Sequence, residues 1–336
     1  MEKEIRKILL EIFPFKTNFK KKFLRLFCFI LLFISFFIPV NCQIQAFQIN
    51  EKEVNSEYCL NLNPKTIIIA NFIGEEDSKK EIIFGTFDSK LFVLSLSNLK
   101  EYFNLNTEGN VKQIEIIDIN NDGKNELIFS TENNFINIVD SNSKEIYEYQ
   151  LLDEIIKFNF LDSDKDGFID IIVATSRGII AINKNGEEIW KNFVEMPLII
   201  NFLIKNIDNF AEEEIIGYTN QSVFILKYNG GSPKIINFDF PIKAFSIYDT
   251  STENHVVIAL YNKDLYWMDY KGNKNFILNT ETKVTKIIPS TYGTEYFKRN
   301  FLFILYDDKK IDAIDTSGGK VDNLNDLNLP HFLWQH

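Results

Sequence analysis

The sequence predicts an all-β fold, a β-propeller built from repeated four-stranded antiparallel sheets, and three observations predict it. Short apolar runs rich in β-branched residues recur with tight Gly/Asn turns between them. The expected second strands of successive units begin at intervals of 45, 44, 44, 41 and 45 residues, measured from Glu81, Glu126, Asp170 (or Ile169), Glu214, His255 and about Asn300. These second strands are almost wholly apolar, as at residues 171–174, which suits a strand covered on both faces. Neighbouring sheets must therefore cover each other.

Two alternative architectures are an open β-solenoid and a two-sheet sandwich. The regular spacing argues against a sandwich, and a four-strand unit is too long for one solenoid coil. Six units can be counted, and seven blades are the alternative. A ring normally closes by completing one blade with strands from both chain ends, which removes free edges. Ile44–Ile49 alternates weakly and is the candidate closing strand.

An apolar segment at residues 26–40 precedes the repeats and follows the basic cluster Lys20, Lys21, Lys22 and Arg25. Its length fits a signal-peptide core of roughly 7–15 residues better than a membrane span of roughly 20. We expect a signal peptide or signal-anchor helix at residues 1–42 and the propeller at residues 43–336. Cleavage just before Gln43 would give a secreted or luminal protein. Without cleavage, residues 26–40 would tether it to the membrane, and a buried helix of the fold is a third alternative.

Charge restricts the partners that we expect. The formal net charge of the whole chain is −11. Residues 1–25 hold eight basic and three acidic side chains, so the remainder of the chain has a net charge of −16. An acidic body disfavours nucleic-acid binding, which needs a positive surface. Of the three cysteines, only Cys59 clearly belongs to the mature body, so no internal disulfide is expected.

The strands are expected in the following order. The first unit has strands at residues 66–72, 81–86 and 91–96; the second at 111–118, 126–131, 135–140 and 145–149; the third at 155–160, 169–175, 178–183 and 188–193. The fourth has strands at 198–204, 214–218, 222–226 and 234–238; the fifth at 242–248, 255–260, 265–269 and 274–278; the sixth at 284–290, 301–305 and 311–315.

Two loops between first and second strands carry acidic residues in a fixed order. In the third unit these are Asp162, Asp164, Asp166 and Asp170 around Gly167, and in the second Asp118, Asn120, Asp122 and Glu126 around Gly123. The fourth unit keeps Asn206, Asp208 and Glu214 but has Phe210 and Ala211 in place of the third ligand and the glycine.

This pattern, Asp-x-Asn/Asp-x-Asp-Gly-x-x-Glu/Asp followed by an apolar strand, resembles the FG-GAP or VCBS repeat of integrin-alpha-like propellers. The resemblance covers residues 61–320 as an array, with specific motifs in two units. It implies an adhesion, recognition or assembly module whose loops bind calcium.

The chemistry of the loops is consistent with that implication. Calcium takes six to eight oxygen ligands around a loop that turns sharply at glycine. The side chains named above, with the carbonyls of Phe168 and Lys124, supply such oxygens. The alternative is that Asp and Asn only stabilise turns by bonding their own backbone. Four carboxylates within nine residues repel one another unless a cation lies among them, which favours calcium.

Catalysis has little support in the sequence. No Gly-x-Ser-x-Gly elbow, His-Glu-x-x-His or glycine-rich phosphate loop occurs. Residues 178–190 also resemble the tryptophan-docking repeat of quinoprotein propellers, but only once, and we expect Trp190 to be a packing aromatic between blades. The predicted function is therefore a calcium-stabilised module that recognises a protein or cell-surface ligand. The alternatives are a membrane-tethered luminal scaffold subunit and an enzyme, either quinone-dependent or carbohydrate-active.

Overall fold

The computed structural model describes residues 44–49, 54–60, 64–73, 80–142, 145–193, 198–208, 210, 212–249, 254–294, 297–315 and 319. The expected signal segment at residues 26–40 lies outside them, and so does the expected cleavage point. Within the described part of the chain, no helix has the length and apolarity needed to span a bilayer.

The chain divides into two compact units, Met1–Pro64 and Lys65–His336. In the first unit, β1 (Ile44–Ile49) pairs antiparallel with β2 (Val54–Leu60). The strand expected at Ile44–Ile49 is therefore present, but its partner is β2, a strand that the sequence did not predict. No described strand of the six sheets pairs with β1, so the expected closing role is not observed.

The second unit consists of six antiparallel sheets, which we call blades 1 to 6. Blade 1 contains β3 (Pro64–Ala70), β4 (Glu81–Thr86), β5 (Lys90–Ser95) and β6 (Glu101–Asn106); blade 2 contains β7 (Val111–Ile117), β8 (Glu126–Thr131), β9 (Phe135–Val139) and β10 (Glu145–Gln150); blade 3 contains β11 (Ile155–Leu161), β12 (Asp170–Thr175), β13 (Ile179–Ile182) and β14 (Glu188–Asn192).

Blade 4 contains β15 (Asn201–Lys205), β16 (Glu214–Tyr218), β17 (Ser222–Lys227) and β18 (Lys234–Asn237); blade 5 contains β19 (Ile242–Asp249), β20 (Asn254–Leu260), β21 (Asp264–Met268) and β22 (Lys274–Asn279); blade 6 contains β23 (Val284–Thr294), β24 (Phe297–Tyr306) and β25 (Ile311–Asp315). Among the described residues blade 6 thus has three strands, where the repeat predicts four.

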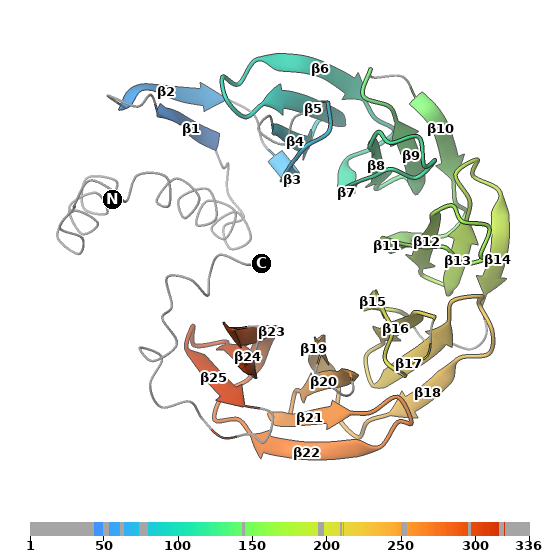
Figure 1. Cartoon of the computed structure of the whole chain (residues 1–336), viewed down its shortest axis with the longest axis vertical. Coiled ribbons are helices and arrows are strands. Elements are labelled where there is room, and N and C mark those ends of the chain that lie inside the picture. Colours follow the sequence, from blue (N-terminus) through green and yellow to red (C-terminus); the bar gives the residue numbers. More distant parts are fainter. Residues whose placement is uncertain are drawn as a thin grey trace. The chain divides into compact units, whose positions relative to one another are not determined.

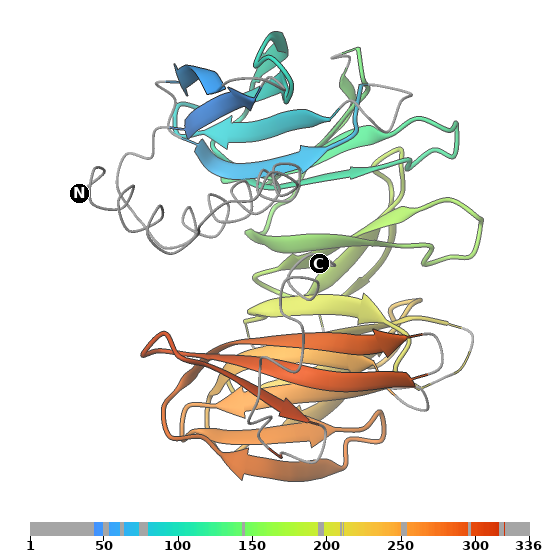
Figure 2. The same ribbon diagram turned by 60° about the vertical axis from the view of Figure 1, so that its left-hand side comes forward.

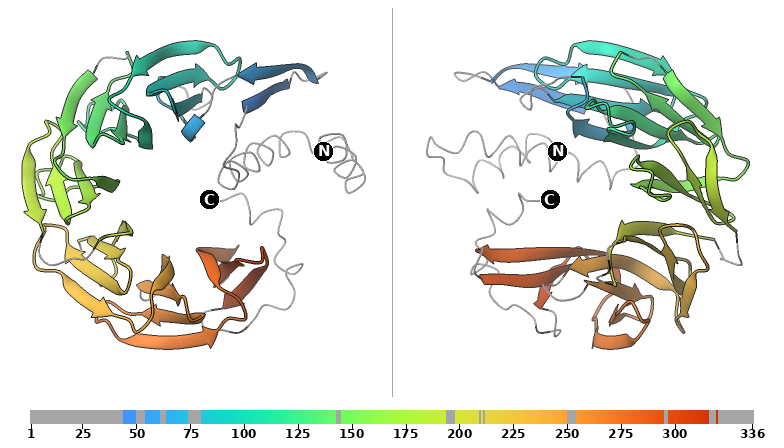
Figure 3. Two further views of the ribbon diagram at one scale, coloured as in Figure 1. Left: turned by 180° about the vertical axis from the view of Figure 1, so that it is seen from behind. Right: turned by 45° about the vertical axis from the view of Figure 1, so that its right-hand side comes forward.

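Each blade is an up-and-down meander in which strands adjacent in sequence pair with each other. In the second unit, the first strand of each blade lies on the inner side of the array and the last on the outer side (Figures 1 and 3). Because the strands alternate in direction, each blade has two ends. We call the edge that carries the loops between first and second strands the loop rim. The opposite edge, which carries the turns between second and third strands and the connections from one blade to the next, is the turn rim.

The core lies between blades. The second strands β4, β8 and β12 are buried at all six of their positions, as expected for strands covered on both faces. Apolar clusters join side chains of successive blades, for example Ile138 of blade 2 with Phe158 and Val173 of blade 3. A cluster of this kind recurs at each junction from blade 1 to blade 6. Burial of this apolar surface is the main force that holds the blades together.

A second kind of contact joins the outer strands of some blades to the next blade. Tyr147 of β10 packs over Gly186 of blade 3, and Trp190 of β14 packs over Gly230 of blade 4, each so closely that a Cβ on the glycine would overlap the ring. Both glycines also have positive φ, +74° and +72°, a conformation that favours glycine. The prediction that Trp190 packs between blades is therefore confirmed.

The predicted strands of blades 1 to 5 match the observed ones within three residues at each end, but the sequence missed β6. The main difference in length is in blade 6, where β23 and β24 form a long hairpin that extends to Thr294 and Phe297 (Figure 2). The sequence predicted strands only at residues 284–290 and 301–305.

Candidate functional site

A buried carboxylate begins the second strand of each of blades 1 to 4, at Glu81, Glu126, Asp170 and Glu214. Each one accepts a backbone N–H from the preceding loop: Phe72 to Glu81 at 2.8 Å, Ile119 to Glu126 at 3.1 Å, Ser163 to Asp170 at 2.8 Å and Ile207 to Glu214 at 3.0 Å. These carboxylates hold the start of each loop against the blade.

Burial strongly affects the ionisation of three of these carboxylates. It raises the pKa of both Glu126 and Glu214 to about 7, and repulsion by Asp122 and Asp118 adds to the effect at Glu126. Burial also raises the pKa of Asp170, with Asp164 and Asp166 adding to the effect. A nearby cation would favour the charged forms and oppose these shifts.

The loop of blade 3 gathers three of the predicted ligands. Carboxylate oxygens of Asp162, Asp164 and Asp166 lie within 4.8 Å of one another. The loop closes on itself, because Asp162 Oδ2 accepts the N–H of Gly167 at 3.1 Å and Asp166 Oδ1 accepts that of Phe168 at 2.8 Å. Gly167 has φ +87°, so the glycine at this position meets the requirement of a sharp turn.

The donor set of this loop fits a hard cation in one further respect. Asp162 Oδ1 is buried and has no hydrogen-bond partner, and a buried acceptor left unpaired is costly. Asp170 is placed differently from the expected ligand: its Oδ2 accepts both the backbone N–H and the hydroxyl of Ser163, the latter at 2.7 Å. It lies outside the group of three carboxylates.

The loop of blade 2 has the same backbone plan. Asn121 and Gly123 have φ +60° and +84°, matching Lys165 at +63° and Gly167. Asp118 Oδ2 accepts the N–H of Gly123 at 2.8 Å. The side chain of Asn120, however, already makes two hydrogen bonds within the loop. Its Oδ1 accepts the N–H of Asp122 at 2.9 Å, and its Nδ2 donates to Glu126 at 3.3 Å.

The remaining positions of that loop also differ from blade 3. Asp122 Oδ1 accepts the N–H of Lys124 at 2.8 Å. Within the described residues the acidic groups of this loop do not converge as those of blade 3 do. The polar side chains of this loop therefore act mainly by stabilising the turn, to a greater extent than those of the blade 3 loop.

Contacts along the loop rim connect successive blades. Asn125 donates to the carbonyl of Asn71 at 3.1 Å, Asn121 to that of Gly167 at 2.9 Å, and Asn254 to that of Asn206 at 2.6 Å. These contacts could not be predicted from the sequence, since each depends on which loops the packing of the blades brings together.

The turn rim carries most of the exposed large apolar side chains. Of the twelve in the described residues, seven lie on this rim: Phe87, Leu152, Leu198, Ile200, Phe240, Tyr261 and Ile311. Leu152 is 96% exposed, and Leu198 58%. Of the other five, two lie on the loop rim and three on outer strands. In the sequence these residues look like ordinary loop positions until the strand directions are known, so this surface could not be predicted.

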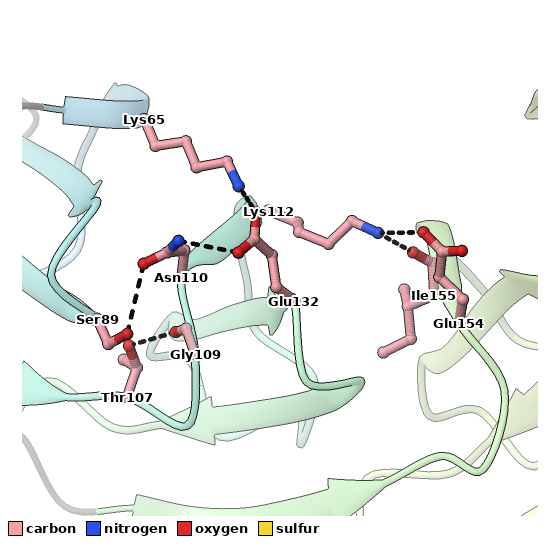
Figure 4. Close-up of polar contacts among 9 residues, drawn as sticks. All are labelled: Lys65, Ser89, Thr107, Gly109, Asn110, Lys112, Glu132, Glu154 and Ile155. Carbon is pink, nitrogen blue, oxygen red and sulfur yellow. Dashed lines mark hydrogen bonds and ion pairs between the residues drawn. The ribbon is translucent and has the colours of Figure 1, made fainter.

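Polar contacts fix the turns of this rim to each other. Glu132 of blade 2 is ion-paired with Lys65 of blade 1 and accepts from Asn110 at 2.8 Å, while Lys112 reaches into blade 3 to Glu154 at 3.4 Å and to the carbonyl of Ile155 at 2.5 Å (Figure 4). These contacts link the turn rim of blade 1 to that of blade 2, and that of blade 2 to that of blade 3.

Comparisons with known proteins concern the fold. No protein-family model and no curated protein matches the chain. Among solved structures, BBS1N in complex with ARL6DN is 13% identical, with 76% of this chain and 78% of that chain covered and a TM-score of 0.54. Sqt1 from Saccharomyces cerevisiae is 9% identical, with 82% and 79% covered and a TM-score of 0.60. The computationally designed Ika8 protein is 10% identical, with 77% and 75% covered and a TM-score of 0.54.

The chain is a β-propeller. The repeated antiparallel sheets and these structural likenesses agree on that fold, and the count of sheets fits six blades. At such low identity the likeness shows the fold alone. The finer resemblance to FG-GAP or VCBS repeats stays a prediction from the loops of blades 2 and 3.

Proposed function

We propose that this propeller is a protein-recognition module that binds its partner through the turn rim. The observation that carries the proposal is that seven of the twelve exposed large apolar side chains of the described residues lie on that rim. Charged and polar groups between them, such as Lys112 and Glu154, supply the polar surroundings that interfaces also need.

Hydrogen bonds between the inner strands of blades 2, 3 and 4 also support this surface. Gln113 of blade 2 pairs with blade 3 as a strand would: its Nε2 donates to the carbonyl of Phe158 and its Oε1 accepts the N–H of Phe158, both at 2.9 Å. Lys157, the equivalent position in blade 3, donates to Asn201 of blade 4 at 3.0 Å. A pre-organised surface loses less entropy on binding.

A structural neighbour supports binding as the function of this fold. BBS1N was solved in complex with another protein, ARL6DN. We therefore propose a protein partner for this chain too, and binding rather than catalysis as its role.

We further propose that calcium stabilises the loop of blade 3. Asp162, Asp164 and Asp166 would hold the ion, and Asp170 would secure the loop. When bound, the ion would neutralise the repulsion among these carboxylates. The expected result is a calcium-dependent rise in melting temperature that magnesium does not reproduce and that Asp164→Asn reduces. No calcium-dependent rise would refute this part of the proposal.

Residues 26–40 motivate a secretory location, with the propeller extracellular or luminal. N-terminal sequencing of protein from its native source tests this. A mature terminus at Gln43 would support a cleaved signal peptide. A terminus upstream of Phe27 would instead support a membrane-tethered luminal scaffold.

Docking at the turn rim is tested with matched variants of the full chain. Leu152→Glu and Leu198→Glu place charges on the turn rim, while Tyr102→Glu and Phe276→Glu place them at exposed positions of outer strands. All four should fold, because these side chains are exposed. We expect proteins captured by the wild-type chain to be lost with the two turn-rim variants and retained with the two controls. Equal capture by all four, or loss with the controls only, would refute docking at this rim.

A further inference from the structure

Two lysines flank an exposed tyrosine on the turn rim, where blade 5 meets blade 6. Tyr261 lies in the turn after β20 and is 43% exposed. The ammonium groups of Lys243, on β19, and Lys283, just before β23, each lie 5.3 Å from the centre of its ring. An aromatic face attracts each ammonium group, but two like charges around one ring also repel each other.

The junction of blades 2 and 3 has the same two backbone positions. Lys112 in β7 and Lys243 in β19 each lie at a register shift at the start of the strand, so each is the extra residue of a β-bulge. Glu154 and Lys283 directly precede β11 and β23. The carbonyl of each accepts a backbone N–H from the turn between the second and third strands of its blade, at 2.9 Å in both cases. The two pairs of positions are therefore equivalent.

The charges at these equivalent positions differ. Between blades 2 and 3, Lys112 is ion-paired with Glu154 at 3.4 Å. Between blades 5 and 6, Lys283 stands in the place of the glutamate, so Lys243 faces a second cation where Lys112 faces an anion. In the part of the chain that the structure describes, neither Lys243 nor Lys283 forms an ion pair with a carboxylate. An anion at this junction would supply the missing opposite charge and reduce the repulsion.

The surroundings add apolar surface to this positive charge. Phe240, in the connection that leads into β19, is 48% exposed, and Ile311, the first residue of β25, is 57% exposed. The acidic residues Glu281 and Asp307 are exposed and close in sequence, but they pair with neither lysine. Because the whole chain carries a net charge of −11, the two lysines are a local exception on an acidic molecule.

We propose that Lys243 and Lys283 bind the carboxylate of a glutamate or aspartate on the protein partner, beside an apolar residue that packs on Tyr261. The proposal rests on docking at the turn rim, and it names the chemistry that the partner presents to blades 5 and 6. The partner's carboxylate would take the role that Glu154 has between blades 2 and 3, and would accept charge-assisted hydrogen bonds from both ammonium groups.

Isothermal titration of the full chain in EDTA tests the proposal with defined peptides. The probe is acetyl-Leu-Glu-Glu-Leu-amide, and its uncharged match is acetyl-Leu-Gln-Gln-Leu-amide. We expect saturable binding of the acidic peptide, at least tenfold weaker binding of the match, and weaker binding of the acidic peptide as salt is added, because salt screens exposed charges.

Variants then locate the binding. Lys243→Met and Lys283→Met should each weaken binding of the acidic peptide by about threefold, as expected for loss of one exposed ion pair, and the double variant by about tenfold. Lys283→Glu should weaken it at least as much as the double variant, since it recreates the ion pair of blades 2 and 3 and engages Lys243. Lys100→Met, at an exposed position in the turn between β5 and β6, is the control and should leave binding unchanged.

Three results would overturn the proposal: no saturable binding of the acidic peptide, equal binding of its uncharged match, or unchanged binding in the double variant. The Leu152→Glu and Leu198→Glu variants test docking at the turn rim independently of these peptides. Loss of capture in those two variants, together with any of the three results, would refute the carboxylate site and leave docking at the turn rim standing.

Discussion

The carboxylate of Glu214 offers a quantitative test of how buried acids hold the loops. Glu214 is 7% exposed and accepts the N–H of Ile207 at 3.0 Å. Replacement by glutamine keeps a carbonyl oxygen as acceptor and removes the charge. The substitution therefore separates the cost of burying a carboxylate from the benefit of the hydrogen bond.

The sign and size of the expected change in stability with pH follow from the pKa of Glu214, which burial raises from 4.5 to about 7. Between these two values the folded chain keeps a proton that the unfolded chain has lost, so stability falls as the pH rises and is constant above about pH 7. At about 1.4 kcal/mol per pKa unit, the loss for Glu214, to which the neighbouring Asp208 contributes, is on the order of 3 kcal/mol. Glutamine does not titrate, so Glu214→Gln should lack this loss.

Urea unfolding of the full chain at pH 4 and pH 8, in EDTA, measures the effect. The free energy of unfolding of Glu214→Gln minus that of the wild type should increase by about 3 kcal/mol from pH 4 to pH 8. Glu213→Gln, at the exposed neighbouring position, should show no such change. An equal pH dependence in Glu214→Gln and the wild type would refute the reasoning.

Three further outcomes are expected. Gln113→Ala should destabilise the chain by about 1–3 kcal/mol in urea unfolding, because it leaves the N–H and carbonyl of Phe158 without their interblade partner; a change below 0.5 kcal/mol would contradict that role. Trp190→Ala should cost about 3 kcal/mol or more by the same measurement, since it opens a cavity over Gly230, and a neutral effect would contradict close packing there. If calcium binds the blade 3 loop as proposed, Asp162→Asn should lessen the rise in melting temperature on addition of calcium, whereas an undiminished rise would contradict the proposed ligands.

Much of the fold could be predicted from the sequence because each second strand combines two local signals. An acidic residue such as Glu126 or Glu214 is followed at once by an apolar run, and both signals recur at nearly constant spacing. The outermost strand of blade 1 escaped prediction for the opposite reason. The outer strands β14 and β22 follow a turn that contains glycine, whereas residues 96–100, which precede β6, contain none, so the turn signal is missing there.

The candidate sites were predictable only in part. The order of Asp162, Asp164 and Asp166 around Gly167 indicated a turn that gathers carboxylates, and they do converge. The sequence could not show that Asp170 would bond Ser163, because an aspartate serves equally as metal ligand or backbone clamp. The turn rim and the pair of lysines beside Tyr261 arise from the packing of different blades, which no local pattern encodes.

The most direct test of recognition at the turn rim is site-specific photo-crosslinking of the full chain in its native source. A benzophenone side chain would replace Leu152 or Phe240 on the turn rim, and Tyr102 or Phe276 on outer strands. We predict that both turn-rim positions cross-link to the same protein and that the outer-strand positions do not. Cross-links to that protein from the outer-strand positions alone, or none from the turn rim, would contradict the proposed function.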